Sequence, residues 1–104
     1  MRRVRLLEDA AQEAIEAAAW YEHERVGLGQ EFVRALDTAL DLLEEEIIPL
    51  IPMSGAGDRQ RVKRIILKRF PYDIVVLERP DEVLIVAVAH HSRRPGYWRH
   101  RLRT

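Results

Sequence analysis

Residues 61–90 read RVKRIILKRFPYDIVVLERPDEVLIVAVAH. This stretch contains three runs rich in β-branched and other apolar residues, separated by short segments that contain proline. We expect strands over Arg61–Phe70, Tyr72–Arg79 and Val83–His90, with a turn at Pro80–Glu82. The last run is apolar on both faces, which is typical of a strand inside a sheet. Runs joined this closely predict a three-stranded antiparallel meander.

Two helices are predicted upstream of these strands. The first spans Ala10–Glu24, with Asp9 as its N-cap and Gln12 completing a capping box. The second spans Gln30–Ile47 and carries an apolar stripe at helical spacing. Between them Gly27-Leu28-Gly29 permits positive φ and a tight reversal, so the pair forms an antiparallel hairpin. Alanines on the first helix allow the second helix to approach closely.

Three further segments complete the predicted domain. A short strand covers Arg3–Leu7, a loop covers Ile51–Asp58, and a basic tail runs from Ser92 to Thr104. The first strand must add to one edge of the sheet, and the helical hairpin packs on one face. The predicted fold class is therefore α+β, in a single domain over residues 1–104.

The composition is that of a small globular protein. Hydrophobic residues make up 47% of the chain and charged residues 33%, which argues against intrinsic disorder. Because there is no cysteine, disulfides, thiol catalysis and cysteine-bound zinc are excluded. No apolar run approaches the roughly 18 residues of a membrane span, and the N-terminus lacks the pattern of a signal peptide. We therefore expect a cytoplasmic protein with no membrane partner.

The net charge of zero conceals a strong division of charge. The first fifty residues hold five arginines and twelve acidic residues, whereas the rest hold twelve basic and five acidic residues. This asymmetry favours an anionic partner for the second half, either a nucleic acid or an acidic protein segment. The alternative is a compositional bias toward arginine, with the two halves pairing internally.

Five local patterns follow one another along nearly the whole chain. They are AAWYE at 18–22, GLGQEF at 27–32, RFPYDIV at 69–75, VAVAH at 86–90 and RRPGYW at 93–98, followed by Arg101. In this order they resemble the RelE/ParE family of plasmid-stabilising toxins from type II toxin–antitoxin modules. The resemblance implies a growth-inhibiting toxin that a cognate antitoxin protein neutralises within a toxin–antitoxin hetero-oligomer. It does not choose between the two activities of the family.

The first activity that the resemblance implies is ribosome-dependent mRNA cleavage of the RelE kind, and this is the main hypothesis. Cleavage through the ribose 2′-hydroxyl needs a base, an acid and cations that stabilise the phosphate charge. By resemblance, the catalytic group is Arg61, Arg64, His91, Arg93 and Tyr97. A second group binds nucleic acid or the antitoxin: Lys63, Lys68, Arg69, Arg94, Arg99 and Arg101. The alternatives are ParE-like inhibition of DNA gyrase without nuclease activity, and an inactive remnant that only binds an antitoxin.

Several of these residues also have a purely structural interpretation. The arginines are either a solvated surface or a docking face, and Trp98 either stacks on bases or covers the edge of a core. The adjacent His90 and His91 point to opposite faces of a strand, so we predict no metal site, and no cofactor is expected. In the first long strand, odd-numbered and even-numbered residues alternate between faces. Neither face is purely apolar, which leaves open the face that meets the helices.

Overall fold

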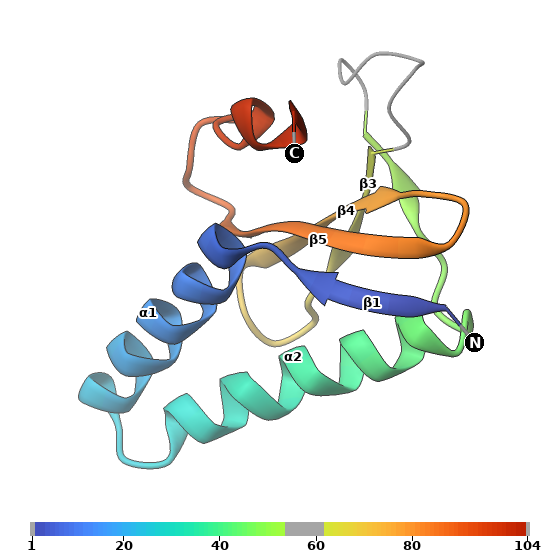
Figure 1. Cartoon of the computed structure of the whole chain (residues 1–104). Helices are drawn as coiled ribbons and strands as arrows, with labels where there is room; N and C mark the ends of the chain where they lie inside the picture. The colour runs from blue at the N-terminus through green and yellow to red at the C-terminus, as the bar shows by residue number, and fades with distance from the viewer. Residues whose placement is uncertain (1, 54–61, 104) are drawn as a thin grey trace.

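The computed structural model describes residues 2–53 and 62–103. The elements are β1 (Arg3–Leu6), α1 (Glu8–Glu24), α2 (Leu28–Glu44), β2 (Ile51–Pro52), β3 (Val62–Ile66), β4 (Tyr72–Glu78), β5 (Glu82–His90) and the 3₁₀ helix η1 (Arg99–Arg103). Figure 1 shows the helical hairpin on one side of the sheet and the C-terminal segment on the other. The predicted α+β class is therefore confirmed, with an additional layer formed by the chain after β5.

The sheet is mixed, with five strands in the order β1-β5-β4-β3-β2. The antiparallel meander β3-β4-β5 is present as predicted, and β1 adds to one edge by pairing parallel with β5, Val4 opposite Val83. The prediction of a loop at Ile51 and Pro52 is wrong, because they form β2 and pair with β3. Proline lacks a backbone donor, which an edge strand tolerates because one side of it has no neighbour.

A β-bulge in β5 changes which side chains face the helices. Val75 of β4 lies opposite Ala87, but Val76 lies opposite Ile85, so Val86 is the extra residue. Val86 and Ala87 consequently both belong to the core on the C-terminal side. Beyond the bulge the alternation resumes, and Val88 joins the core on the helix side.

The sheet separates two apolar cores. The core on the helix side is built on Phe32 and Leu43 of α2, together with Ile74 of β4. The core on the C-terminal side is closed by Trp98, which is only 3% exposed, and by Leu102. Trp98 therefore covers a core rather than presenting its ring for stacking. In β3, Ile65 belongs to the helix side and Val62 to the other, which settles the question of the two faces.

The helix ends differ from the prediction in detail. The capping box is wrong: α1 begins at Glu8 with Leu7 as its N-cap and no side-chain cap, and Asp9 lies inside the first turn. There its carboxylate is still favoured by the helix dipole. At the hairpin, Gly27 has a φ of +89°, and a Cβ on Gly29 would lie 2.5 Å from the carbonyl oxygen of Ala18. The two helices thus approach as closely as the small residues allow.

The first long strand is shorter than the predicted Arg61–Phe70. It ends at Ile66, and Leu67 then donates a backbone hydrogen bond to the carbonyl of Tyr72, closing a turn. Phe70 lies in this turn and is buried against Phe32, with the two ring centroids 5.2 Å apart. The turn places the Phe70 ring in the helix-side core, and the strand therefore ends at Ile66.

Candidate functional site

A cleft with a volume of about 330 Å³ opens where the chain leaves β5. We call it the basic cleft because three arginines line it, and its polar lining is Arg64, Asp73, His90, His91, Arg93 and Arg94, with Tyr97 beside them. Its apolar floor includes Val75 and Trp98. Four of the five residues predicted to be catalytic therefore share one cavity, and the fifth, Arg61, lies outside the described residues. The meander and the returning C-terminal segment bring them together.

One carboxylate orients two of these side chains. Asp73 of β4 lies 3.3 Å from Arg64 Nη1 through Oδ2, and 2.9 Å from His91 Nε2 through Oδ1. The Nε of Arg64 is buried and has no hydrogen-bond partner among residues 2–53 and 62–103. Asp73 thus holds Arg64 and His91 on the same wall of the basic cleft.

Tyr97 is held by its neighbours on three sides. Its hydroxyl donates to Glu13 Oε2 at 2.5 Å, and the guanidinium carbon of Arg93 lies 3.9 Å from the ring centroid. Arg101 lies 5.3 Å from the same centroid. Burial, and then the hydrogen bond to Glu13, raise the pKa of Tyr97 far above its usual range. The phenol consequently keeps its proton at neutral pH and directs it to Glu13.

Glu13, like Asp73, is a residue of the site that was not predicted from the sequence. Its carboxylate accepts hydrogen bonds from the backbone N–H of Val88 at 3.0 Å, from Tyr97, and from Arg101 Nη1 and Nη2 at 2.9 and 3.2 Å. It therefore joins α1, β5 and the C-terminal segment. A signal exists in the sequence, since Glu13 lies at helical spacing between the buried Ala10 and Ala17.

The residues of the predicted binding group separate into two classes. Lys63 lies 2.7 Å from Glu78, Arg69 lies 2.6 Å from Glu31, and Arg101 is bound to Glu13. Of the others, Arg94 lines the basic cleft, whereas Lys68 and Arg99 are exposed outside its lining. Two of these pairs, Arg69 with Glu31 and Arg101 with Glu13, join the two halves of the chain, so internal pairing accounts for part of the charge division.

The ion pairs affect the titration of their carboxylates. The hydrogen bond from Lys63, followed by the one from Arg2, lowers the pKa of Glu78 below its usual range. The hydrogen bond from Arg69 lowers the pKa of Glu31 in the same way. Both carboxylates are thus held in the charged form that their partners require.

Two further properties concern the part of the chain that the structure describes. Within it, no group of three or more histidine or acidic side chains is arranged to hold a metal ion. No helix in residues 2–53 or 62–103 is long and apolar enough to cross a membrane.

Comparison with known proteins gives a family match and a similarity to solved structures. The model of a family described as the ParE toxin of the type II toxin–antitoxin system, parDE, matches residues 4–95. A solved structure of the chromosomal ParDE toxin–antitoxin system from P. aeruginosa contains a chain similar in fold, with a TM-score of 0.72 and 15% sequence identity. The similarity covers 86% of this chain and 96% of that one. Comparison with curated protein sequences gives no match.

Proposed function

Because this chain belongs to the ParE toxin family of type II toxin–antitoxin systems, we propose that it stops growth by inhibiting DNA gyrase without cleaving RNA. A cognate antitoxin then neutralises it in a hetero-oligomer. Membership of the ParE family favours this activity over the RelE-like mRNA cleavage that was the main hypothesis from the sequence. The action takes place in the cytoplasm, where gyrase and its DNA are found.

The state of Tyr97 is the observation that supports this proposal best. A nuclease of the predicted kind needs a group in the basic cleft that exchanges a proton with the RNA. The Tyr97 proton is directed to Glu13, and the ring is covered by Arg93 at 3.9 Å. Since Arg101 binds the same carboxylate, Tyr97 acts as part of a structural network. This leaves the basic cleft suited to docking an anionic surface.

Cleavage of mRNA remains the second candidate because of one specific contact. His91 Nε2 lies 2.9 Å from Asp73 Oδ1, and both residues line the same cleft as Arg93 and Arg94. A histidine oriented by a carboxylate next to cations is an arrangement that also serves proton transfer to and from RNA. The experiment below separates the two candidates.

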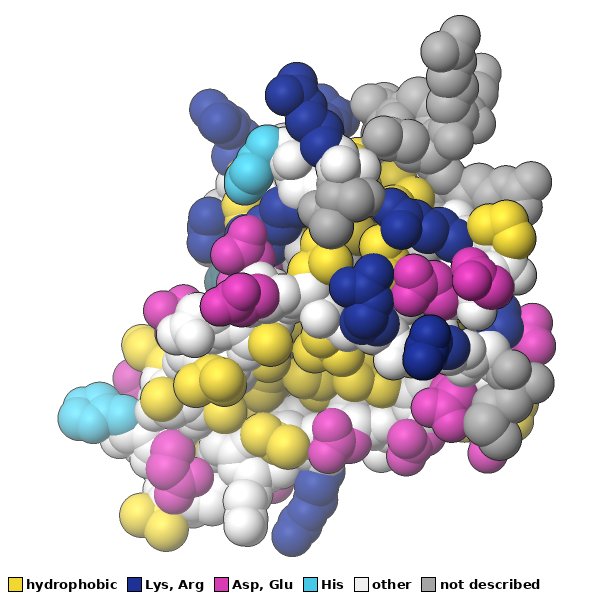
Figure 2. Space-filling view, viewed as in Figure 1, with side chains coloured by type: hydrophobic (Ala, Val, Ile, Leu, Met, Phe, Trp, Pro, Cys, Tyr) yellow, Lys and Arg dark blue, Asp and Glu magenta, His cyan; other side chains and the backbone are white. Residues whose placement is uncertain are grey.

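The surface also supports a protein partner. Figure 2 shows hydrophobic side chains gathered along the face formed by α1, α2 and β1, bordered by charged side chains of both signs. Exposed large hydrophobic side chains on α1 include Ile15 and Trp20. Contiguous apolar surface of this kind marks protein interaction sites. We assign this face to the antitoxin and the basic cleft to the target.

The test is induction of this chain alone in bacteria, with pulse labelling of DNA and protein synthesis. We expect DNA synthesis to stop first, with filamentation and with intact messages. Arg94→Ala should weaken the effect, because Arg94 lines the basic cleft without a partner among the described residues. Arg34→Ala, which removes an exposed arginine on α2, is the matched control and should leave toxicity unchanged.

Two other results would contradict the proposal. An early stop in protein synthesis with cut messages would establish the nuclease, and His91→Ala would then abolish toxicity. Harmless induction at a verified protein level would identify the inactive remnant.

A further inference from the structure

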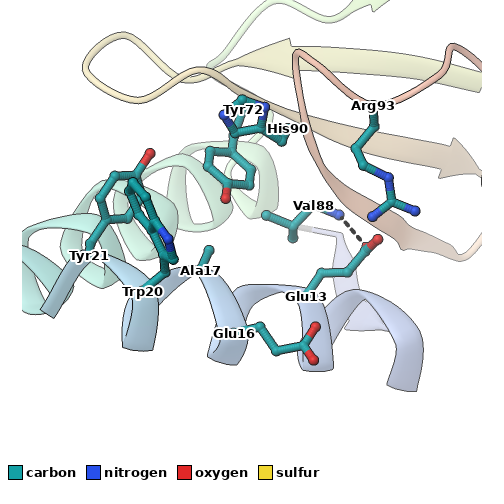
Figure 3. A pocket seen from close by; sticks show the side chains of 9 residues that line it. All are labelled: Glu13, Glu16, Ala17, Trp20, Tyr21, Tyr72, Val88, His90 and Arg93. Atoms are coloured by element: carbon teal, nitrogen blue, oxygen red, sulfur yellow. Dashed lines mark hydrogen bonds between the residues drawn. The ribbon is translucent and has the colours of Figure 1, made fainter. Parts of the chain in front are cut away.

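A second cavity lies on the other side of the β5 terminus, against α1. It has a volume of about 300 Å³ and lies between α1 and the adjoining ends of β4 and β5 (Figure 3). We call it the acidic aromatic pocket, and its lining is Glu13, Glu16, Ala17, Trp20, Tyr21, Tyr72, Val88, His90 and Arg93. The proposed gyrase inhibition makes no use of Glu16, Trp20 or the two tyrosines.

The aromatic end of the pocket presents an open indole. Trp20 is 58% exposed, and it meets Tyr21 edge to face, with centroids 5.3 Å apart and planes at 80°. An edge contact of this kind leaves a face of the indole uncovered. The faces of tryptophan rings attract cations more strongly than those of other aromatic residues. Figure 3 shows Trp20 and Tyr21 at one end of the pocket and Arg93 at the opposite end.

Two phenol groups line the pocket without protein partners. Neither Tyr21 nor Tyr72 has a side-chain hydrogen bond to any residue in 2–53 or 62–103. Only 9% of the surface of Tyr21 is exposed, and Tyr21 nevertheless lines this cavity. Burial raises the pKa of both tyrosines, so both remain neutral. Their oxygens are available to accept hydrogen bonds from a bound group.

The charge of the pocket is set by a free carboxylate. Glu13 is engaged by Tyr97, Arg101 and the Val88 N–H, as described above. Glu16, one turn further along α1, has no hydrogen bond or ion pair with the described residues. Arg93 is occupied over the Tyr97 ring at the far end. Figure 3 shows the Glu16 side chain on α1 between Trp20 and Arg93, so an unpaired carboxylate gives the α1 wall of the pocket a negative charge that favours a cation.

We propose that the acidic aromatic pocket receives an arginine side chain of the antitoxin. The planar guanidinium stacks on Trp20, pairs with Glu16, and donates hydrogen bonds to the phenol oxygens of Tyr21 and Tyr72. The identity of the partner rests on the proposed function, whereas the preference for guanidinium does not.

The first experiment measures that preference directly in the full chain. Nα-acetyl-arginine amide is titrated into ¹⁵N-labelled protein, and the two indole N–H signals are followed. We expect a saturable shift of the Trp20 signal in the millimolar range. The signal of Trp98, which is 3% exposed in the other core, should stay in place. Nα-acetyl-glutamate amide should move neither signal, and Nα-acetyl-lysine amide should bind more weakly than the arginine probe.

Variants of exposed residues identify the groups involved. Glu16→Gln should raise the dissociation constant about threefold, as for an exposed ion pair. Glu24→Gln, which removes another exposed carboxylate from the same helix, should leave it unchanged. An unmoved Trp20 signal, an equal response in Glu16→Gln, or lysine binding as tight as arginine would overturn the assignment to guanidinium.

The second experiment tests the partner by coexpression with the antitoxin. Glu16→Gln and Trp20→Ala toxins should remain toxic, and the antitoxin should protect cells from them less well than from the unchanged toxin. Full protection in both variants would overturn the assignment to the antitoxin. If the chain alone proves harmless, the proposed function fails, but the probe titration still decides the preference of the pocket.

Discussion

Replacement of Glu13 tests how the C-terminal segment is held on the domain. Glu13→Ala removes the acceptor for Tyr97, Arg101 and the Val88 N–H in one step. The side chain of Arg101 is only 11% exposed, so its charge is left buried without this carboxylate. Removing one partner of a buried ion pair costs about 3–5 kcal/mol. We expect the lower end, about 3 kcal/mol, because Asp9 and the Val86 carbonyl still contact Arg101.

Urea and thermal unfolding, followed by far-UV circular dichroism, measure this loss. For a domain of this size, about 3 kcal/mol corresponds to a fall in Tm of roughly 12–24 °C. Glu16→Ala is the matched control, because its carboxylate lies one turn away and is exposed. The control should stay within about 0.5 kcal/mol of the unchanged protein.

A double-mutant cycle isolates the pair itself. We expect Glu13→Gln and Arg101→Met to show a coupling free energy between about 1 and 3 kcal/mol. A Glu13→Ala protein no less stable than the Glu16→Ala control would refute the reasoning. So would additive effects in the cycle, since they would mean that Glu13 and Arg101 do not act as a unit.

Three other predictions concern pH and backbone packing. Because the pKa of Tyr97 is raised in the folded protein, the unfolded chain loses the phenol proton first as pH rises. The contribution of Tyr97 to the free energy of unfolding is therefore complete below about pH 10 and is lost as pH rises further. In urea unfolding from pH 8 to 11, Tyr97→Phe should lose less stability than the unchanged protein. The lowered pKa of Glu78 means that this carboxylate stabilises the fold above about pH 4.3 and that the stabilisation is lost as pH falls through the folded pKa. Lys63→Met should raise the pKa of Glu78 in a ¹³C NMR titration, and an unchanged pKa would contradict the pairing. Gly29→Ala should lower the free energy of unfolding by about 2 kcal/mol, because the added Cβ would lie 2.5 Å from the α1 backbone. Gly27→Ala should lower it by about 1 kcal/mol, because a Cβ has open space there but the φ is +89°. The reverse order in chemical unfolding would contradict the close approach of the two helices.

The main elements could be predicted because their signals are local. The apolar run Val83–His90 and the amphipathic stripe of α2 depend on residues close in sequence, and both elements are present, although α2 spans Leu28–Glu44 and not the predicted Gln30–Ile47. The ordered series of short patterns identified the family from residues alone, and the family match confirms it. Patterning of this kind is enough to give the class and order of elements.

The features that were missed depend on contacts between distant parts of the chain. The strand at Ile51–Pro52 exists only because β3 offers it an edge, and the bulge at Val86 appears only in the pairing with β4. Asp9 is a residue type that often caps helices, but the N-cap of α1 is Leu7, two residues earlier. Glu13 finds its partners 75 to 88 residues away, which no local pattern encodes.

For the predicted site, the location of the residues could be predicted but their roles could not. The family resemblance grouped Arg64, His91, Arg93 and Tyr97, and these four side chains share one cleft. Their roles depend on what each side chain binds, and Tyr97 binds Glu13 on a helix that the sequence analysis had not connected to the site. The catalytic assignments of these residues therefore stay predictions.

The most direct test of the central claim combines the purified chain with purified DNA gyrase, ATP and relaxed plasmid. The account predicts loss of supercoiling that depends on toxin concentration, trapped double-strand breaks, and full recovery when the antitoxin is added first. Message added to a translating ribosome mixture with the same protein should stay intact. Normal supercoiling at a large excess of toxin, with cleavage of the ribosome-bound message, would contradict the account and favour a catalytic role for His91, oriented by Asp73.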